Sequence, residues 1–262
     1  MSDGLIIDQL KKTQILELLK EGKRVDGRQF DEPRKLTIDI GVIPKAEGSA
    51  RARLGDTEVV AGVKIQPERP FPDTGDKGML ICTAEILPIA HPSAETGPPQ
   101  PHVVELARVT DRGIRESGML DMKQLVLEKD KSVIGIFCDN AVTDHDGNLF
   151  DACSYASTAA INSCKIPKYE MQDEKPVKIE DEFIEPPITT LPVSVTMAKI
   201  GDFIVVDPTI EEWGIMDARI TITSNSDGNV VGMMPHPERA AEKEINQIDH
   251  KPSSLIFESL IE

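Results

Sequence analysis

The sequence has 262 residues, of which 39% are hydrophobic and 28% charged, and its formal net charge is -16 at pH 7. This length suits one large domain or two of ordinary size, and this composition is typical of a soluble globular protein. No apolar run approaches the roughly 20 residues of a membrane helix, and the N-terminus lacks the features of a secretory signal. We therefore expect a cytoplasmic protein that makes no membrane contact.

The negative charge limits what the protein can bind by itself. Nucleic-acid affinity comes mostly from Lys and Arg side chains that displace counterions, so an isoelectric point near 4.8 argues against autonomous binding to a polyanion. If the protein handles RNA, it needs local basic patches and a more basic partner.

The cysteines predict neither a metal site nor a redox pair. They are widely spaced, lie among apolar or small residues and form no CxxC motif. We expect four buried thiols in a reducing compartment: Cys82, Cys138, Cys153 and Cys164.

The first part of the chain predicts one helix followed by several strands. Apolar residues at helical spacing predict a helix over 7–19 that stops at Gly22, and the basic turn 23–28 follows. Strands are predicted at 36–40, 49–54, 57–65 and 79–87, the last of them a nearly continuous apolar run that we expect to be buried. The Pro- and Gly-rich loops 67–78 and 91–101 are long enough to be functional or interfacial.

The second part continues with a helix at 103–117, strands at 124–127 and 132–142, and a helix of small residues at 151–164 that can lie close to a sheet. The acidic, proline-bearing stretch 165–190 has weak periodicity, and we place the interdomain connection there. Strands at 193–200, 203–207, 217–223 and 229–234 precede a final helix near 253–261. Many strands with a few packed helices, in two halves, is an α+β pattern.

The helix at 103–117 has the most informative pattern. At 100° per residue, Arg108, Arg112 and Arg115 fall within roughly 60° of one another. The opposite side, which can pack, holds Val103, Leu106, Thr110, Gly113 and Ile114. The planar guanidinium of arginine suits phosphate, so this ridge indicates an RNA backbone or a phosphorylated ligand. The alternative is a solvated face on which the arginines pair with Glu105, Asp111 and Glu116.

Five motifs occur in one order: RVDGR at 24–28, AEGSARARLGDTEVVAGVK at 46–64, ELARVTDRGIRES at 105–117, DHDGNLFDACSYAS at 144–157 and VVDPTIEEWGIMDARI at 205–220. Together they resemble RNase PH-type proteins and, more narrowly over residues 16–231, the non-catalytic RNase PH-like subunit of the archaeal exosome. The resemblance implies a two-domain RNase PH-like fold with mixed sheets and packed helices. We divide it into an N-terminal helix and basic turn (1–28), domain 1 (29–164), an acidic linker (165–190) and domain 2 with an atypical tail (191–262).

The resemblance also implies a function. Subunits of this type alternate with a catalytic RNase PH-like partner in a hexameric ring, which carries RNA-binding cap subunits and degrades RNA from the 3′ end by phosphorolysis. It implies no catalytic residue, cofactor or metal in this chain. Arg112, in the VTDR motif, would face the partner's RNA channel, with Arg108 and Arg115 beside it. For Arg28 and the strand residues Arg51 and Arg53, ion pairs across the subunit interface stay as open as RNA contact.

The turn at 147–151 argues against phosphorolysis by the chain itself. Active members hold the attacking phosphate with a Gly-Ser/Thr-Arg loop at a helix N-terminus, but here the stretch reads Gly147-Asn148-Leu149, with Asp151 close behind. An apolar side chain and a carboxylate cannot cradle a dianion. The neighbouring acids deepen the negative field: Asp139, Asp144 and Asp146.

Three acids keep an alternative open. Glu211, Glu212 and Asp217 lie where active members place catalytic and metal-binding carboxylates. They either hold Mg²⁺ across a turn or belong to a solvated loop with one structural aspartate. The alternative function is therefore a phosphorolytic exoribonuclease in its own right, with Glu211 and Asp217 at its centre.

From about Gly228 the sequence departs from this pattern. GNVVGMMPHPERAAE and SSLIFESLIE resemble the end of a class I glutamine amidotransferase of the phosphoribosylformylglycinamidine synthase type. That resemblance implies that His236 and Glu238 orient a cysteine nucleophile, but no cysteine stands in the Gly-x-Cys-x-Gly elbow that the chemistry needs. Glutaminase activity is therefore disfavoured. Chance, a splice, a frame change or an engineered sequence would each explain the segment.

Overall fold

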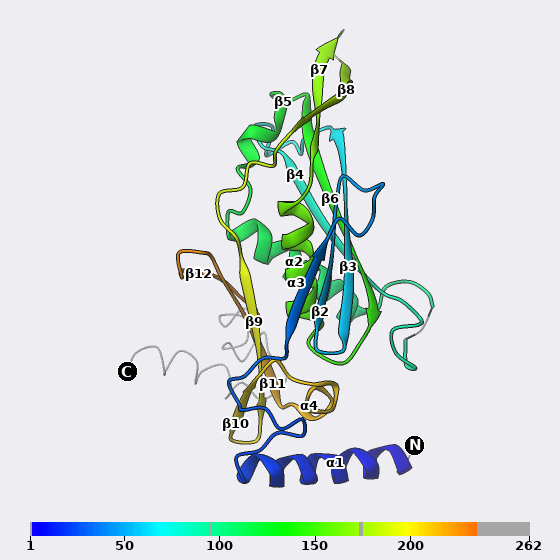
Figure 1. Ribbon diagram of the computed structural model, residues 1–262, viewed down its shortest axis with the longest axis vertical. Helices are drawn as coiled ribbons and strands as arrows, with labels where there is room; N and C mark the ends of the chain where they lie inside the picture. Colours follow the sequence, from blue (N-terminus) through cyan, green and yellow to red (C-terminus); the bar gives the residue numbers. More distant parts are fainter. Residues whose placement is uncertain (1, 95, 173–174, 235–262) are drawn as a thin grey trace.

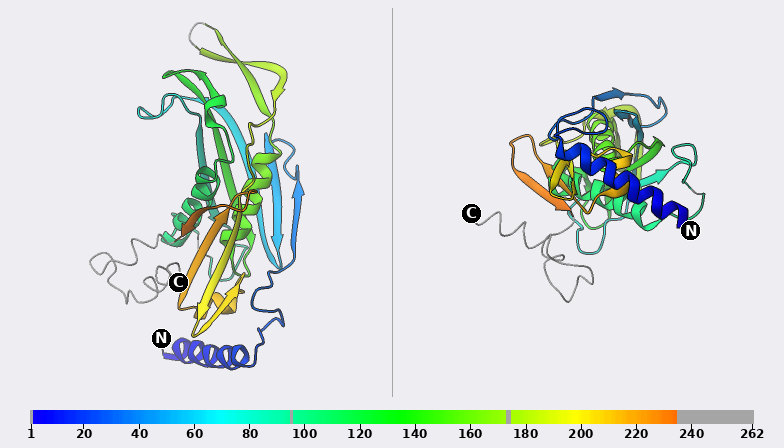
Figure 2. Two further views of the ribbon diagram at one scale, coloured as in Figure 1. Left: turned by 90° about the vertical axis from the view of Figure 1, so that its left-hand side faces the viewer. Right: turned by 90° about the horizontal axis from the view of Figure 1, so that it is seen from below.

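The computed structural model describes residues 2–94, 96–172 and 175–234, with side chains from residue 11 onward. Two main sheets enclose two long helices (Figure 1). Helices α2 (Pro101–Glu116) and α3 (Leu149–Asn162) both contact the two sheets, and the left view of Figure 2 shows them between the layers. This is the expected α+β arrangement of sheets packed with helices.

The first sheet has six strands in the order β1-β2-β3-β6-β4, with the short β5 paired to β6. All pairs are antiparallel except β4 with β6, which run parallel. Every second residue of β3 from Thr57 to Ile65 is buried, as its alternating pattern predicts. The strands are β1 (Leu36–Ile40), β2 (Gly48–Leu54), β3 (Thr57–Glu68), β4 (Met79–Ile86), β5 (Val126–Glu128) and β6 (Ser132–Asp144).

Two strand predictions in this sheet need correction. The apolar run of β4 predicts a buried strand, but only Leu80 and Cys82 are buried, because β4 is an edge strand with one strand neighbour and α2 beside it. The first half of the strand predicted at 124–127 belongs to a 3₁₀ turn, η1 (Met122–Leu125), and the second half belongs to β5, which has only three residues. The Asp121 carboxylate accepts a hydrogen bond from the Lys123 amide and so starts this turn.

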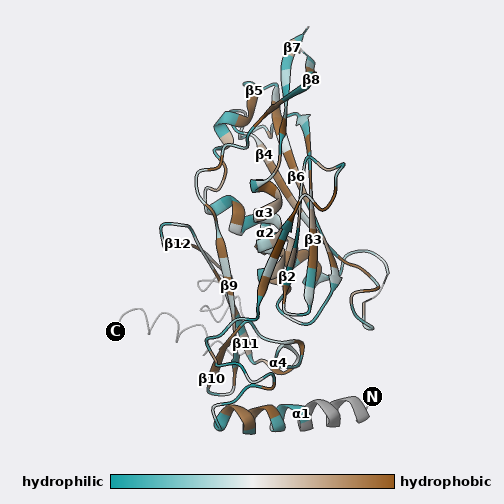
Figure 3. Ribbon diagram, viewed as in Figure 1, coloured by the Kyte–Doolittle hydropathy of each residue, from teal (hydrophilic) through white to brown (hydrophobic). Residues whose placement is uncertain are grey.

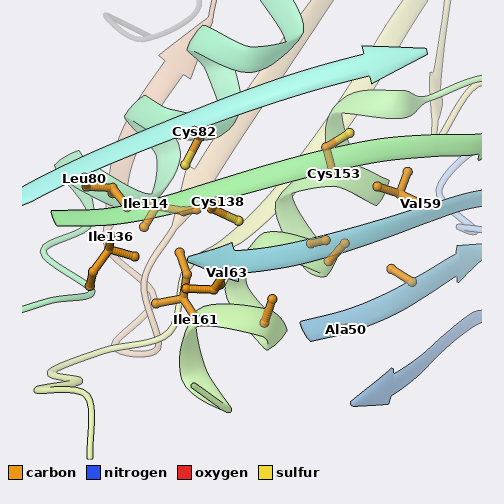
Figure 4. Close-up of a cluster of buried hydrophobic side chains, with 14 of the residues drawn as sticks. Ala50, Val59, Val63, Leu80, Cys82, Ile114, Ile136, Cys138, Cys153 and Ile161 are labelled. Carbon is orange, nitrogen blue, oxygen red and sulfur yellow. The ribbon is translucent and has the colours of Figure 1, made fainter. Parts of the chain in front are cut away.

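The main core lies where α3 packs on β2, β3 and β6 (Figure 4). The small side chains of α3 allow a close approach, as predicted: a Cβ added to Gly48 of β2 would lie 2.4 Å from the carbonyl oxygen of Ala160. All four cysteines are free and buried in this core, which confirms the predicted burial of the thiols: Cys82, Cys138, Cys153 and Cys164.

The second sheet is antiparallel and has the order β10-β9-β11-β12. Its strands are β9 (Val193–Ile200), β10 (Phe203–Val206), β11 (Ala218–Ser224) and β12 (Val230–Met234), and all four were expected. Helix α1 (Ser2–Lys20) crosses the end of this sheet (Figure 2, right) and buries Ile15 and Leu19 against it. Within the described ranges, no helix is long and apolar enough to cross a membrane.

Helix α4 (Ile210–Ile215) replaces the turn expected around the three acids. It begins with a capping box, in which the Thr209 hydroxyl accepts from the Glu212 amide and the Glu212 carboxylate accepts from the Thr209 amide. The sequence contains the pattern of a capping box, because Thr209 is followed three residues later by Glu212.

The stretch expected as a connection contains a hairpin. Strands β7 (Ile166–Gln172) and β8 (Lys175–Ile184) pair antiparallel and extend from the end of the molecule opposite α1 (Figure 1). Hydrophilic residues occur along both strands (Figure 3), and most of β8 is exposed. Between β8 and β9, Ile188 forms an isolated antiparallel β-bridge with Leu120.

Candidate nucleic-acid interface

Helix α2 presents the two faces that its sequence predicts. Arg108, Arg112 and Arg115 are all exposed. The opposite face is buried between the two sheets and consists of Val103, Leu106, Val109, Thr110, Gly113 and Ile114. Local helix geometry therefore separates a packing face from an arginine ridge.

Two acidic residues of α2 form ion pairs with different partners, one within the helix and one outside it. Arg115 forms an ion pair with Asp111 one turn earlier (Nη2 to Oδ2, 2.8 Å) and donates to the Leu80 carbonyl oxygen of β4 (2.9 Å). Glu105 pairs instead with Arg219 of β11. The intrahelical pairing that we considered as the alternative thus holds for Arg115, which is tied to the edge of the first sheet.

A groove of about 580 Å³ runs between α2 and the edge strand β4. We call it the arginine groove, because Arg108, Arg112 and Arg115 line one side of it and residues 80–84 of β4 the other. A guanidinium group can bind phosphate through two parallel hydrogen bonds, in a bidentate geometry. Asp111 and Glu116 also line the groove, and its three arginines make it the candidate site for a ligand that carries phosphate groups.

The turn before α3 is closed by its own side chains. Asn148 caps the helix in a left-handed conformation (φ 44°), and its side-chain amide donates to Asp151 (2.8 Å) and Asp207 (2.7 Å). The Asp151 carboxylate also accepts from the amide (2.9 Å) and the hydroxyl (2.7 Å) of Thr196. Leu149, at the position of the phosphate-binding arginine, is buried in the core. Side chains of the protein itself therefore satisfy one another at this turn.

The electrostatics of this turn follow from its burial. Burial raises the pKa of Asp151 to about 7, although its hydrogen bonds from Asn148 and Thr196 act in the opposite direction. Burial also works against ionised Asp207, but Arg34 and Asn148 hold the pKa of Asp207 below its ordinary value. Arg34 contacts both Asp207 oxygens (2.9 and 2.8 Å) and the Asp146 carbonyl (2.6 Å).

The other arginines singled out in the sequence have partners within the chain. Arg28 pairs with Asp26 and Asp207 (2.6 and 3.2 Å). Arg53 pairs with Glu58, and Arg51 lies 3.9 Å from the same carboxylate. Arg28 and Arg53 therefore have partners within the chain, whereas Nε of Arg51 is buried without a hydrogen bond among the residues that the structure describes.

The three acids of the alternative function are separated. Glu212 is fully buried and accepts from Arg24 at 2.9 and 2.6 Å, Asp217 pairs with Lys12 at 2.7 Å, and Glu211 is exposed. No cluster of three or more His, Cys, Asp or Glu side chains suited to a metal ion occurs in the part of the chain that the structure describes. Glu212 and Asp217 act as structural anchors, for the basic turn and for α1.

Sequence comparison identifies the family to which this fold belongs. A model described as the 3′ exoribonuclease family, domain 1, matches residues 32–167, and the model of domain 2 of the same family matches residues 190–244. The chain belongs to the 3′ exoribonuclease family.

Named members of the 3′ exoribonuclease family are similar over most of their length. Proteins called exosome complex component Rrp42 are 47% identical in Thermococcus gammatolerans (88% of this chain, 85% of the relative) and 43% identical in Methanocella arvoryzae (87% and 85%). A solved structure of the Archaeoglobus fulgidus exosome with RNA bound to the active site contains a chain 46% identical, with a TM-score of 0.80 and 87% of each chain covered. An archaeal exosome core gives 44% identity and a TM-score of 0.76, over 87% of this chain and 85% of that one.

The comparisons do not support the amidotransferase resemblance of the tail. The domain 2 match of the 3′ exoribonuclease family continues to residue 244, past the PHPE motif, and β12 pairs with β11 in the second sheet. His236, Glu238 and the helix expected near 253–261 lie outside the described residues.

Proposed function

We propose that this chain is a non-catalytic subunit of an exosome, which shapes the active site of a catalytic RNase PH-like partner and contributes Arg112 to RNA binding. The similarity to Rrp42 proteins and to a chain of an RNA-bound exosome supports an exosome role. The observation that carries the non-catalytic assignment is the turn before α3, closed by Asn148, Asp151 and Asp207.

Phosphorolysis needs an attacking phosphate held in line with the terminal phosphodiester. In this chain the position of the phosphate-binding arginine is taken by Leu149, which points into the core, and Asp151 occupies the first turn of α3. At this helix start the Asp151 amide donates to the side-chain oxygen of Asn148 (3.4 Å), and the Ala152 amide donates to the Asn148 carbonyl oxygen (3.5 Å). Phosphate binding and catalysis therefore belong to the partner.

The arginine groove is the part of this chain that meets RNA. Its three arginines are exposed and outnumber the two acids that line it, Asp111 and Glu116, on a protein with a net charge of -16. The rest of the surface repels a polyanion, so binding depends on a second subunit on the other side of the RNA. Arg112 is at the centre of the ridge, with Arg108 and Arg115 one turn away on either side.

The exposed edge of the first sheet supports assembly with other subunits. Strand β1 has a neighbour on one side only, and its apolar side chains Leu36, Ile38 and Ile40 are 39%, 43% and 66% exposed. An unpaired edge with a row of apolar side chains is unfavourable in water and is stabilised when a partner covers it. We assign the chain to heterodimers with the catalytic subunit, three of which form a hexameric ring that carries RNA-binding cap subunits.

The experiment is co-expression with a catalytic RNase PH-like subunit, followed by mass determination and RNA degradation assays. Arg112→Glu is expected to weaken RNA binding by the complex about tenfold or more, the loss of one charge-assisted phosphate contact. Lys178→Glu on β8 makes the same charge change far from the arginine groove and is the matched control. If the complex with Arg112→Glu binds RNA as tightly as the wild-type complex does, the proposal that Arg112 contributes to RNA binding is wrong.

The isolated chain tests the non-catalytic assignment. Incubated with RNA, phosphate and Mg²⁺, it is expected to release no nucleoside diphosphate. Release of diphosphates by the chain alone, lost on Asp217→Asn, would instead establish the exoribonuclease alternative.

A further inference from the structure

A second cavity, of about 750 Å³, adjoins the arginine groove. The two share four lining residues and therefore lie next to each other along β4 and the start of α2: Thr83, Ala84, Pro99 and Val103. Three histidines from separate segments line the second cavity: His91, His102 and His145. We call it the histidine pocket.

In two of these histidines, Nδ1 accepts a hydrogen bond from a backbone amide. The amide of Ser93 donates to Nδ1 of His91 (3.2 Å), and the amide of Gly147 donates to Nδ1 of His145 (3.2 Å). A neutral imidazole that accepts at Nδ1 carries its proton at Nε2. The two rings lie 5.8 Å apart, centroid to centroid. In its neutral form each ring therefore has an Nε2–H group that can donate a hydrogen bond.

The pocket suits a neutral ligand with both donors and acceptors. Burial, together with the nearby His91, His102 and Arg34, lowers the pKa of His145 to about 4, so His145 is uncharged near neutral pH. Glu85 adds a carboxylate, which accepts hydrogen bonds and repels phosphate, and Gln100 adds an amide that can do both. A nucleobase has this mixture of donors and acceptors, together with a flat face that stacks on imidazole.

We infer that the histidine pocket binds one nucleobase of a single-stranded RNA whose backbone lies in the arginine groove. The inference rests on the proposed function, because the same strand must occupy both sites. The two sites would bind different parts of the strand: the guanidinium groups of α2 bind the phosphates, and the imidazole rings of the adjacent pocket contact a base. A volume of about 750 Å³ is within the range of pockets for ligands of nucleotide size.

The test uses the complex with the catalytic subunit and a fluorescent single-stranded RNA in which one base at a time is removed, leaving an abasic sugar. In the wild type, removal of the base at one position is expected to weaken binding about tenfold, because the stacking contact of that base is lost. In the double variant His91→Ala, His102→Ala, intact RNA is expected to bind about tenfold more weakly. Removal of that same base should then have no further effect.

The outcomes separate the two proposals. The Arg112→Glu variant is expected to weaken intact and abasic RNA alike, because it acts on a phosphate. If that variant weakens binding while the double histidine variant binds every RNA as the wild type does, the base pocket is wrong and the RNA role stands. If the double variant is weakened but stays equally sensitive to the abasic position, the histidines act indirectly and the inference is also wrong. Thermal unfolding of both variants shows that the fold is intact.

Discussion

Asp151 is a buried carboxyl group, and burial in the folded protein disfavours its ionised form. The variant Asp151→Asn tests this directly. The neutral acid fits its surroundings, because one oxygen accepts from the Thr196 amide and from Asn148 while the other meets the Thr196 hydroxyl, which can accept in turn. An asparagine side chain can make the same pattern with its oxygen and its amide. The substitution therefore removes the charge and keeps the contacts.

The pH dependence follows from the direction of the pKa shift. The pKa of Asp151 rises on folding from 3.8 to about 7, so the folded chain binds more protons than the unfolded chain between these values. The free energy of unfolding therefore falls as the pH rises from about 4 to about 7. At about 1.4 kcal/mol per pH unit, the full shift corresponds to on the order of 4 kcal/mol above pH 7.

The assay is urea unfolding of the wild type and of Asp151→Asn at several pH values between 4 and 8. Trp213 is the single tryptophan and stacks on Phe150 at the start of α3, so its fluorescence reports on this region. His145 has the opposite effect, because its lowered pKa makes stability rise with pH between about 4 and 6.5. That contribution is present in both proteins and cancels in their difference.

The expected result is equal stability near pH 4 and a growing advantage of Asp151→Asn toward pH 8, of up to a few kcal/mol. A difference that stays constant over this range would show that Asp151 is ionised in the folded protein at all these pH values. A variant that is less stable throughout would show that the carboxylate, in its charged form, is needed by Thr196 and Asn148.

Three further predictions concern the buried polar groups and the closed turn, each measured by urea unfolding. Arg24→Met leaves Glu212 without its buried partner and is expected to cost about 3–5 kcal/mol. Gly147→Ala (φ 91°) places a Cβ 2.6 Å from the backbone at 208–209 and should prevent folding, whereas Gly118→Ala (φ 69°), with nothing within 4 Å, should cost about 1–2 kcal/mol. Leu149→Arg should lower stability by several kcal/mol and create no phosphate affinity, because its position faces the core.

The sequence alone determined those features that depend on local geometry. The two faces of α2, the alternation along β3, the small residues of α3 and the four strands of the second sheet all follow from a repeat of 3.6 or 2 residues. The sequence also showed that Leu149 replaces the arginine of the Gly-Ser/Thr-Arg loop, because this difference can be read by comparison with the motif alone. Even the capping box of α4 was present as a pair three residues apart.

Only the tertiary structure decided which distant groups meet. Arg28 and Arg34 share Asp207 with Asn148, across as many as 179 residues of sequence, and Glu212 meets Arg24 across 188. The position of β4 at a sheet edge, which opens the arginine groove, follows from strand order rather than from the apolar character of β4. The histidine pocket likewise joins three segments that no spacing rule relates. Periodicity describes a residue's neighbours along the chain, whereas ion pairs and pockets depend on packing between elements that the sequence leaves far apart.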